Sequence, residues 1–91
     1  MAIMHNPATP GELLRELLGN RTATELAEHI GVARATISRV LNGRTAVTVD
    51  LGIRLAEALA LSPDLFSKAQ LKYDLWIESQ QKRPKIRPLA A

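Results

Sequence analysis

The chain has 91 residues, is 46% hydrophobic and carries a net charge of +3 at pH 7. This length accommodates one small domain, and this hydrophobic share excludes disorder throughout the chain. The absence of cysteine excludes disulfides and thiolate metal sites, and no apolar run approaches the roughly 20 residues that cross a membrane. The first residues lack the basic segment and apolar run of a signal peptide, so we expect a cytoplasmic protein.

The charge is unevenly distributed along the chain. Four of the 12 basic residues lie in residues 82–91, which contain no acidic residue: Lys82, Arg83, Lys85 and Arg87. The remaining eight basic residues stand against nine acidic ones, so residues 1–81 carry a net charge of −1. A surface that binds an acidic partner such as DNA must therefore be a local patch on a nearly neutral body.

The first predicted element is a helix over Gly11–Leu18, preceded by an extended segment that contains two prolines. Its apolar positions recur at helical spacing: Leu13, Leu14, Leu17 and Leu18. The Gly19-Asn20 pair, in which both residues tolerate left-handed φ, is expected to end this helix.

Two short helices with a tight turn between them are predicted next, over Ala23–Ile30 and Arg34–Leu41. Thr22 and Glu25 have the spacing of a capping box, and Gly31 lies where the chain must turn sharply. The first helix has an apolar face of Leu26, Ala27 and Ile30, and the second has one of Ile37, Val40 and Leu41. The spacing of Ala27, Gly31, Ile37 and Val40 resembles the helix-turn-helix of the phage-repressor-like superfamily.

The face of the second helix opposite its apolar residues carries the side chains that suit a DNA reader. Arg34 or Arg39 can donate two hydrogen bonds to guanine, and Ala35 can touch a thymine methyl. Residues at the start of the first helix and after the second are expected to contact phosphate. The predicted DNA-binding residues are Thr22, Thr24, Arg34, Ala35, Thr36, Ser38, Arg39, Asn42, Arg44 and Thr45.

Two further helices are predicted after a loop over Gly43–Val47. Thr48 is expected to cap the first, and Ser62 the second, with Pro63 at its first position and its end near Gln80. The last helix has more apolar positions than one small core can bury, which indicates a dimer contact. The predicted dimer residues are Phe66, Leu71, Leu75 and Trp76; core or dimer packing suits these aromatic side chains better than base stacking. Arg54 is expected to be a solvated surface charge.

The predicted fold is therefore all-α: a five-helix, phage-repressor-like helix-turn-helix domain over residues 1–81, followed by a flexible basic tail over residues 82–91. No cofactor is implied, and His5 and His29 have no clustered ligands that would make a metal site. Glu12 and Glu16 lie one turn apart, but leucines surround them and a solvated helix face explains them. No nucleophile–base grouping or phosphate loop is present, so we expect no enzyme activity.

Three segments over Asn6–Trp76 are similar to HigA-like antitoxins. NPATPGELLRELL resembles their NPxHPGEILREEF, RATISRVLNGRTAVTVDLGIRLAEAL resembles RATISRLLNGRRAVTPDMALRLAKAL, and SPDLFSKAQLKYDLW resembles SPEFWLNLQAAYDLW. The resemblance implies a homodimer that binds its own double-stranded operator DNA and neutralises a HigB-like mRNA-cleaving ribonuclease toxin. Thr9 departs from the usual histidine, and Ala33 stands where a serine often caps the recognition helix.

Three interpretations of function remain open at this stage. The first is an autorepressor that is also an antitoxin, the second a phage-type repressor without a toxin, and the third a protein-interaction module with the helix-turn-helix as scaffold. Because both the tail and a ribonuclease toxin are basic, we expect the folded body to hold the toxin, through the first helix and the segment before it. Leu89-Ala90-Ala91 resembles a degradation tag, although chance explains three such common residues.

Overall fold

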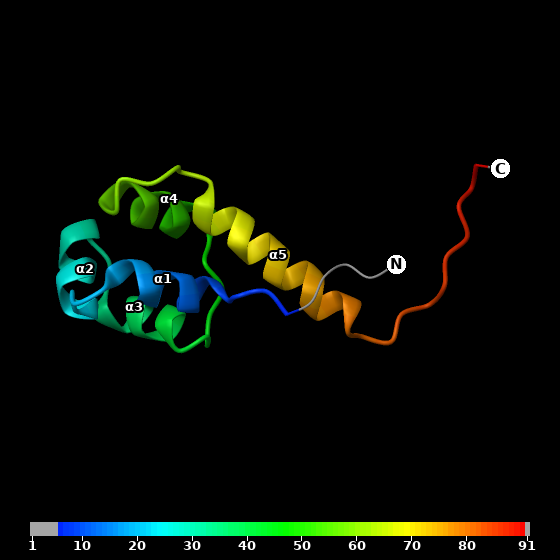
Figure 1. Ribbon diagram of the computed structural model, residues 1–91, viewed down its shortest axis with the longest axis horizontal. Coiled ribbons are helices and arrows are strands. Elements are labelled where there is room, and N and C mark those ends of the chain that lie inside the picture. Colours follow the sequence, from blue (N-terminus) through cyan, green and yellow to red (C-terminus); the bar gives the residue numbers. More distant parts are fainter. Residues whose placement is uncertain (1–5, 91) are drawn as a thin grey trace.

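The computed structural model describes residues 6–90 and contains five α-helices in that range and no strand (Figure 1). The helices are α1 (Pro10–Leu18), α2 (Ala23–Ile30), α3 (Arg34–Leu41), α4 (Val49–Ala58) and α5 (Leu65–Ser79). The all-α prediction is confirmed, and α2 and α3 have the predicted bounds. His5 and Ala91, named above for a metal site and a degradation tag, lie outside the described residues.

Threonine caps start three of the helices. The hydroxyl groups of Thr9, Thr22 and Thr48 each accept a hydrogen bond from the backbone N–H three residues later, at the beginning of α1, α2 and α4. The capping box predicted at Thr22 and Glu25 is present. A second box, formed by Thr9 and Glu12, starts α1 at Pro10, one residue before the predicted start. Thr9, which departs from the family sequence, thus has a local structural role.

The predicted start of the last helix is wrong by two residues. The helix begins at Leu65 after Asp64, rather than at Pro63 after a Ser62 cap. The Ser62 hydroxyl donates to Asp64 Oδ1 at 2.6 Å, so the serine bonds to a side chain instead of capping the helix backbone. This bond, followed by the contact with Lys68, holds the pKa of the Asp64 carboxyl below its usual value.

A single hydrophobic core joins all five helices. Its buried members are Leu14, Leu18, Leu26, Ala27, Ile37, Val40, Val47, Leu51, Leu55, Ala56 and Phe66. The apolar faces predicted for the first four helices supply most of these side chains. Phe66, in the first turn of α5, is fully buried, whereas the rest of α5 extends away from α1–α4 towards the C-terminal segment (Figure 1).

Helix α1 and the end of α3 approach each other closely. A Cβ atom at Gly11 would lie 2.1 Å from the carbonyl oxygen of Val40, well inside van der Waals contact. Beside it, Arg15 Nη2 donates to the carbonyl oxygen of Leu41 at 3.3 Å. The glycine lets the two backbones touch, and the arginine satisfies a carbonyl at the C-terminus of α3. Helix α1 therefore fixes the position of the predicted recognition helix.

Candidate nucleic-acid interface

Helices α2 and α3 form the predicted helix-turn-helix, and each of its spacing constraints has a physical counterpart. Gly31 has φ +76°, and its N–H donates to Ala27, so the glycine ends α2 in the left-handed conformation. Ala27 is buried at the crossing of the helices, and Ile37 and Val40 are buried on the inner face of α3. The outer face of α3 is consequently held in one orientation towards solvent.

That outer face carries three exposed residues, Arg34, Ala35 and Arg39. Thr36 and Ser38, predicted on the same face, are half-buried. Ala33 has no side chain that could cap α3, so backbone N–H groups of its first turn lack a side-chain acceptor, in contrast to α1, α2 and α4. An uncapped helix start beside Arg34 favours a negatively charged ligand, and Arg39 adds a second positive charge in the last turn of the helix.

The remaining predicted DNA-binding residues flank this face. Thr22 is engaged in its capping box and Thr24 is exposed in the first turn of α2. Asn42, Arg44 and Thr45 are exposed immediately after α3. Arg21, which sequence reasoning missed, is also exposed and directly precedes Thr22. Its position next to a predicted phosphate contact was the signal that could have identified it.

The arginines of this region have no acidic partner. Residues 6–90 contain three ion pairs, Arg54–Asp50, Lys68–Asp64 and Arg83–Glu78, and all three lie in or after α4. Arg21, Arg34, Arg39 and Arg44 take part in none of them. Their charges are therefore available to an incoming anion, although the body as a whole carries a net charge of −1.

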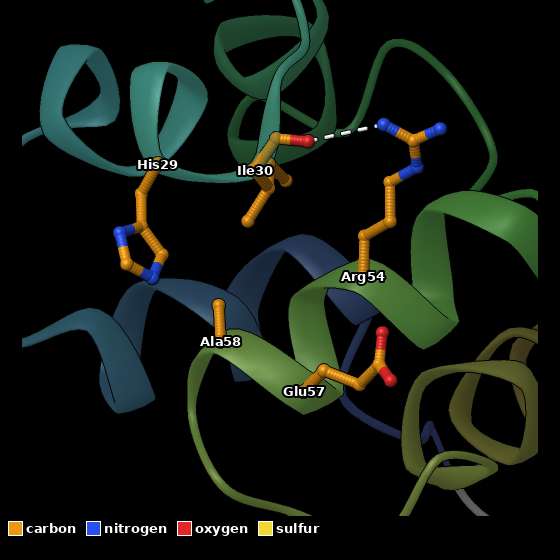
Figure 2. Close-up of a pocket in the computed structure, with 5 residues that line it drawn as sticks. All are labelled: His29, Ile30, Arg54, Glu57 and Ala58. Carbon is orange, nitrogen blue, oxygen red and sulfur yellow. Dashed lines mark hydrogen bonds between the residues drawn. The ribbon is translucent and has the colours of Figure 1, made fainter.

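Arg54 is exposed, as expected of a surface charge, but it also bonds to two neighbouring groups. Its Nη1 donates to the carbonyl oxygen of Ile30 at 3.0 Å (Figure 2), and its Nε lies 3.2 Å from Asp50 Oδ2. The guanidinium thus bonds to the C-terminal carbonyl of α2 from α4 and sits next to the turn at Gly31. A positive charge at a helix C-terminus is favourable for the helix dipole, and here it also ties the turn to α4.

Comparison with known proteins identifies the family. Residues 12–66 match the Helix-turn-helix family. The chain is 38% identical over 74 residues to antitoxin HigA-1 of Vibrio cholerae, an alignment that covers 77% of this chain and 69% of the relative. This chain belongs to the helix-turn-helix family, in its HigA-like branch. The resemblance drawn from the three sequence segments is confirmed.

Solved structures agree with this assignment. A protein of Nostoc punctiforme, described as an antidote protein of a plasmid maintenance system, superposes with a TM-score of 0.77 and 39% identity, over 82% of this chain and 85% of its own. A Pseudomonas aeruginosa protein in complex with its 18-bp operator DNA superposes with a TM-score of 0.75 and 27% identity, over 79% of this chain and 81% of its own. The fold of this HigA-like chain is thus one that is found on operator DNA.

A second surface of this HigA-like protein is an apolar groove of about 810 Å³ between the N-terminal segment, α1 and α5. The apolar residues that line the groove are Pro7, Ala8, Leu13, Leu65, Ala69, Leu71 and Leu75, and Lys68 and Lys72 also line it. Leu71 and Leu75, both predicted as dimer residues, are 59% and 46% exposed. Such exposure of neighbouring leucines on one helix is typical of a contact surface.

The other two predicted dimer residues differ from this pair. The structure corrects the assignment of Phe66, which is fully buried in the core of its own chain and cannot reach a partner. Trp76 is half-buried beside Tyr73, with ring centroids 6.4 Å apart, and does not line the groove. Helical spacing grouped all four side chains on α5, but only the tertiary fold separates those that face the core from those that face outward.

The acidic residues of α1 have a structural explanation. Glu12 accepts the Thr9 backbone N–H at 2.9 Å, and this bond, aided by the Thr9 side chain, lowers the pKa of the Glu12 carboxyl. Glu16 is exposed. In residues 6–90 no group of three or more metal-ligating side chains comes together, and no helix there is long and apolar enough to cross a membrane.

Proposed function

We propose that this protein is a sequence-specific DNA-binding repressor of its own operon and the antitoxin of a HigB-like ribonuclease toxin. One observation carries the DNA part of the proposal. The outer face of α3 presents Arg34, next to the uncapped start of the helix, and Arg39, in its last turn, and neither has an acidic partner. This arrangement suits a helix that enters the major groove of DNA.

Each part of the interface has its own role in the proposal. Arg34 and Arg39 read base edges, with a bidentate bond to guanine as the strongest contact, and Ala35 packs against a thymine methyl. Thr36 and Ser38 contact the edges of the site. The flanking residues Thr22, Thr24, Asn42, Arg44 and Thr45 contact phosphates and fix the register of α3, and Arg21 adds a further phosphate contact.

The operator is an inverted repeat bound by a homodimer. Two copies joined through the groove on α5, with Leu71 and Leu75 of each copy in the contact, carry two α3 helices related by two-fold symmetry. Such a dimer requires half-sites whose centres lie roughly 34 Å apart, or one helical turn of DNA. Dimerisation also doubles the local positive patch, which compensates for the near-neutral body.

The toxin binds to the folded body rather than to the tail. The tail, residues 82–91, is a basic segment whose charge opposes a basic ribonuclease, whereas α1 and the segment before it present an apolar wall at the groove. A protein that binds operator DNA and an mRNA-cleaving enzyme acts in the cytoplasm of a bacterium. Deletion of residues 82–91 should therefore leave neutralisation of the toxin intact, and a truncated protein that releases active toxin contradicts this assignment.

The test of the DNA proposal is a fluorescence-anisotropy titration against the upstream region of the protein's own operon and a scrambled duplex. We expect Arg34→Ala with Arg39→Ala to weaken operator binding by a factor of roughly 30 or more, since each of the two base contacts contributes about 1–3 kcal/mol. The change on scrambled DNA should be much smaller. Arg83→Ala with Arg87→Ala removes the same charge from the tail and serves as the control.

Two outcomes of this titration contradict the proposal. Equal affinity of the wild-type protein for operator and scrambled DNA excludes sequence-specific reading. Failure to bind any DNA at low salt favours the protein-interaction module, which the net charge of −1 in residues 1–81 supports. A phage-type repressor without a toxin is distinguished by the neighbouring gene, because the antitoxin requires a small ribonuclease encoded beside it.

A further inference from the structure

The loop between α3 and α4 carries two of the proposed phosphate contacts, Arg44 and Thr45, but few bonds of its own. Its first residues continue from α3, where Arg44 N–H donates to the Arg39 carbonyl at 2.8 Å. The loop is next fixed at Val47, whose side chain is buried in the core. Arg44 and Thr45 therefore lie on a short span of chain whose far end is held at Val47.

Val47 is held from a helix that is distant in sequence. Its backbone N–H donates to Gln70 Oε1 on α5 at 2.8 Å, in a partly buried position. Gln70 Nε2 donates in turn to Asp74 Oδ1 at 2.9 Å, one turn further along α5, which fixes the orientation of the amide. In the part of the chain that the structure describes, no other hydrogen bond joins residues 43–48 to a helix far away in sequence.

We infer that Gln70 is a positioning residue for DNA binding: from α5 it fixes the loop that presents Arg44 and Thr45 to phosphate. The inference rests on the proposed function and extends it to a residue that does not itself reach DNA. Ala69 and Leu71, the neighbours of Gln70 in sequence, line the apolar groove. Helix α5 thus both lines the groove of the proposed dimer and, through Gln70, bonds to the loop that carries Arg44 and Thr45.

The first measurement is made on free protein. Gln70→Met preserves the length of the side chain and removes the acceptor, so we expect amide exchange of Val47 to become at least roughly tenfold faster by NMR. The double variant Gln70→Glu with Asp74→Asn exchanges the two functional groups without changing the net charge. It retains an acceptor for Val47 and a donor between positions 70 and 74, and should restore slow exchange. Gln81→Met, at an exposed glutamine after α5, is the matched control.

The second measurement is a pair of double-mutant cycles on DNA. We expect Gln70→Met to weaken binding to operator and scrambled DNA alike, by roughly 3- to 10-fold, since phosphate contacts do not depend on sequence. In an Arg44→Ala background that loss should nearly vanish, whereas in an Arg34→Ala background it should remain. Only coupling through the loop produces this difference, because a general loss of stability acts equally in both backgrounds.

The outcomes separate this inference from the proposed function. Wild-type protein that binds no DNA overturns the proposed function. Wild-type protein that binds DNA, combined with equal losses in both backgrounds or unchanged Val47 exchange, overturns the role of Gln70 alone. If Gln70→Met does not fold, Gln70→Asn, whose amide is one methylene too short to reach Val47, must give the same pattern for the inference to stand.

Discussion

The two ends of this molecule use apolar residues in opposite ways. At one end, α1–α4 include the helix-turn-helix, and Leu14, Ile37 and Leu55 of these helices are fully buried together with Phe66. At the other end, α5 continues beyond Phe66 with Leu71 and Leu75, whose exposed fractions are 59% and 46%. The same kind of side chain at the same helical spacing thus completes a core at one end and remains open at the other.

This difference indicates which end has its apolar residues covered within one chain. The helix-turn-helix end is complete within one chain, because its turn, caps and core contacts all come from residues of α1–α5. The outer part of α5 lacks a covering element, and exposing two neighbouring leucines costs free energy that a partner would recover, roughly 25 cal/mol for each Å² covered. Substitutions in three places test this difference between the two ends.

The largest effect is expected at the complete end. Gly11→Ala places a methyl group 2.1 Å from the Val40 carbonyl oxygen, so α1 must move away from α3. We expect the free energy of unfolding to fall by about 3 kcal/mol, at the upper end of the usual cost of overpacking. Urea denaturation of the variant and of the wild type measures this change in the free energy of unfolding.

Gly31→Ala is the control for this substitution. The added methyl group meets no backbone there, since its nearest neighbour is Arg54 Nη1 at 3.8 Å, and the cost of a left-handed alanine is about 1–2 kcal/mol. A smaller loss for Gly11→Ala than for Gly31→Ala would show that the α1–α3 contact is not the tightest constraint on the recognition helix.

An intermediate effect is expected at the open end, on assembly rather than on folding. Leu71→Lys with Leu75→Lys adds charge beside Lys68 and Lys72, and should raise the dissociation constant of the proposed dimer by roughly 100-fold, as expected for about 3 kcal/mol of lost apolar contact. Sedimentation equilibrium measures this constant, and circular dichroism should show unchanged helix content. Leu89→Lys, outside the groove, should change neither property. Loss of helix content in the double variant would mean that α5 depends on these leucines for folding.

The smallest effect is expected where the two regions meet, at the start of α1. Thr9 and Glu12 anchor the segment that contributes Pro7 and Ala8 to the groove. Thr9→Ala should lower the free energy of unfolding by about 1 kcal/mol at neutral pH, the usual cost of losing a threonine cap. Thermal unfolding of this variant and of the wild type measures the difference.

The pH dependence of this capping box has a definite sign. The Thr9 backbone N–H lowers the folded-state pKa of Glu12, so the stabilisation from its ionised carboxyl is present at neutral pH and is lost as the pH falls through that lowered pKa. Glu12→Gln should therefore be less stable than the wild type at neutral pH, and the two stability curves should converge in acid. Parallel curves down to the acid limit would contradict this linkage. Glu16→Gln provides the control for the change in charge.

Much of the DNA-binding end could be predicted from the sequence, because its determinants are local. A threonine three residues before a glutamate is a cap wherever it occurs, and Gly31 between two apolar periodicities allows few conformations other than a left-handed turn. The bounds of α2 and α3 and the burial of Ala27, Ile37 and Val40 followed from these rules. Arg34 and Arg39 were placed on the outer face by the same periodicity.

Contacts between segments distant in sequence could not be predicted from capping, turn residues or apolar spacing. Periodicity put Phe66 and Leu71 on one helix as dimer residues, but which side of α5 faces the core depends on where α4 lies. The hydrogen bond from Arg54 to the Ile30 carbonyl joins residues 24 positions apart, and the bond from the Val47 amide to Gln70 joins residues 23 positions apart. No local pattern specifies the orientation of that carbonyl or that amide. The Ser62 cap failed because a nearer side-chain partner, Asp64, bound its hydroxyl.

The sequence by itself determined the class of the protein: five helices, a helix-turn-helix with an outward basic face, and membership of the HigA-like branch. These properties rest on capping, turn residues and apolar spacing. Such features involve residues that are close in sequence, so they can be predicted from the sequence alone. The packing of the helices decided that Gly11 allows α1 to lie against α3, that Gln70 bonds to the backbone of Val47, and that Leu71 and Leu75 stay exposed while Phe66 is buried. Those outcomes depend on which surfaces meet when the helices pack, and packing is a property of the whole chain.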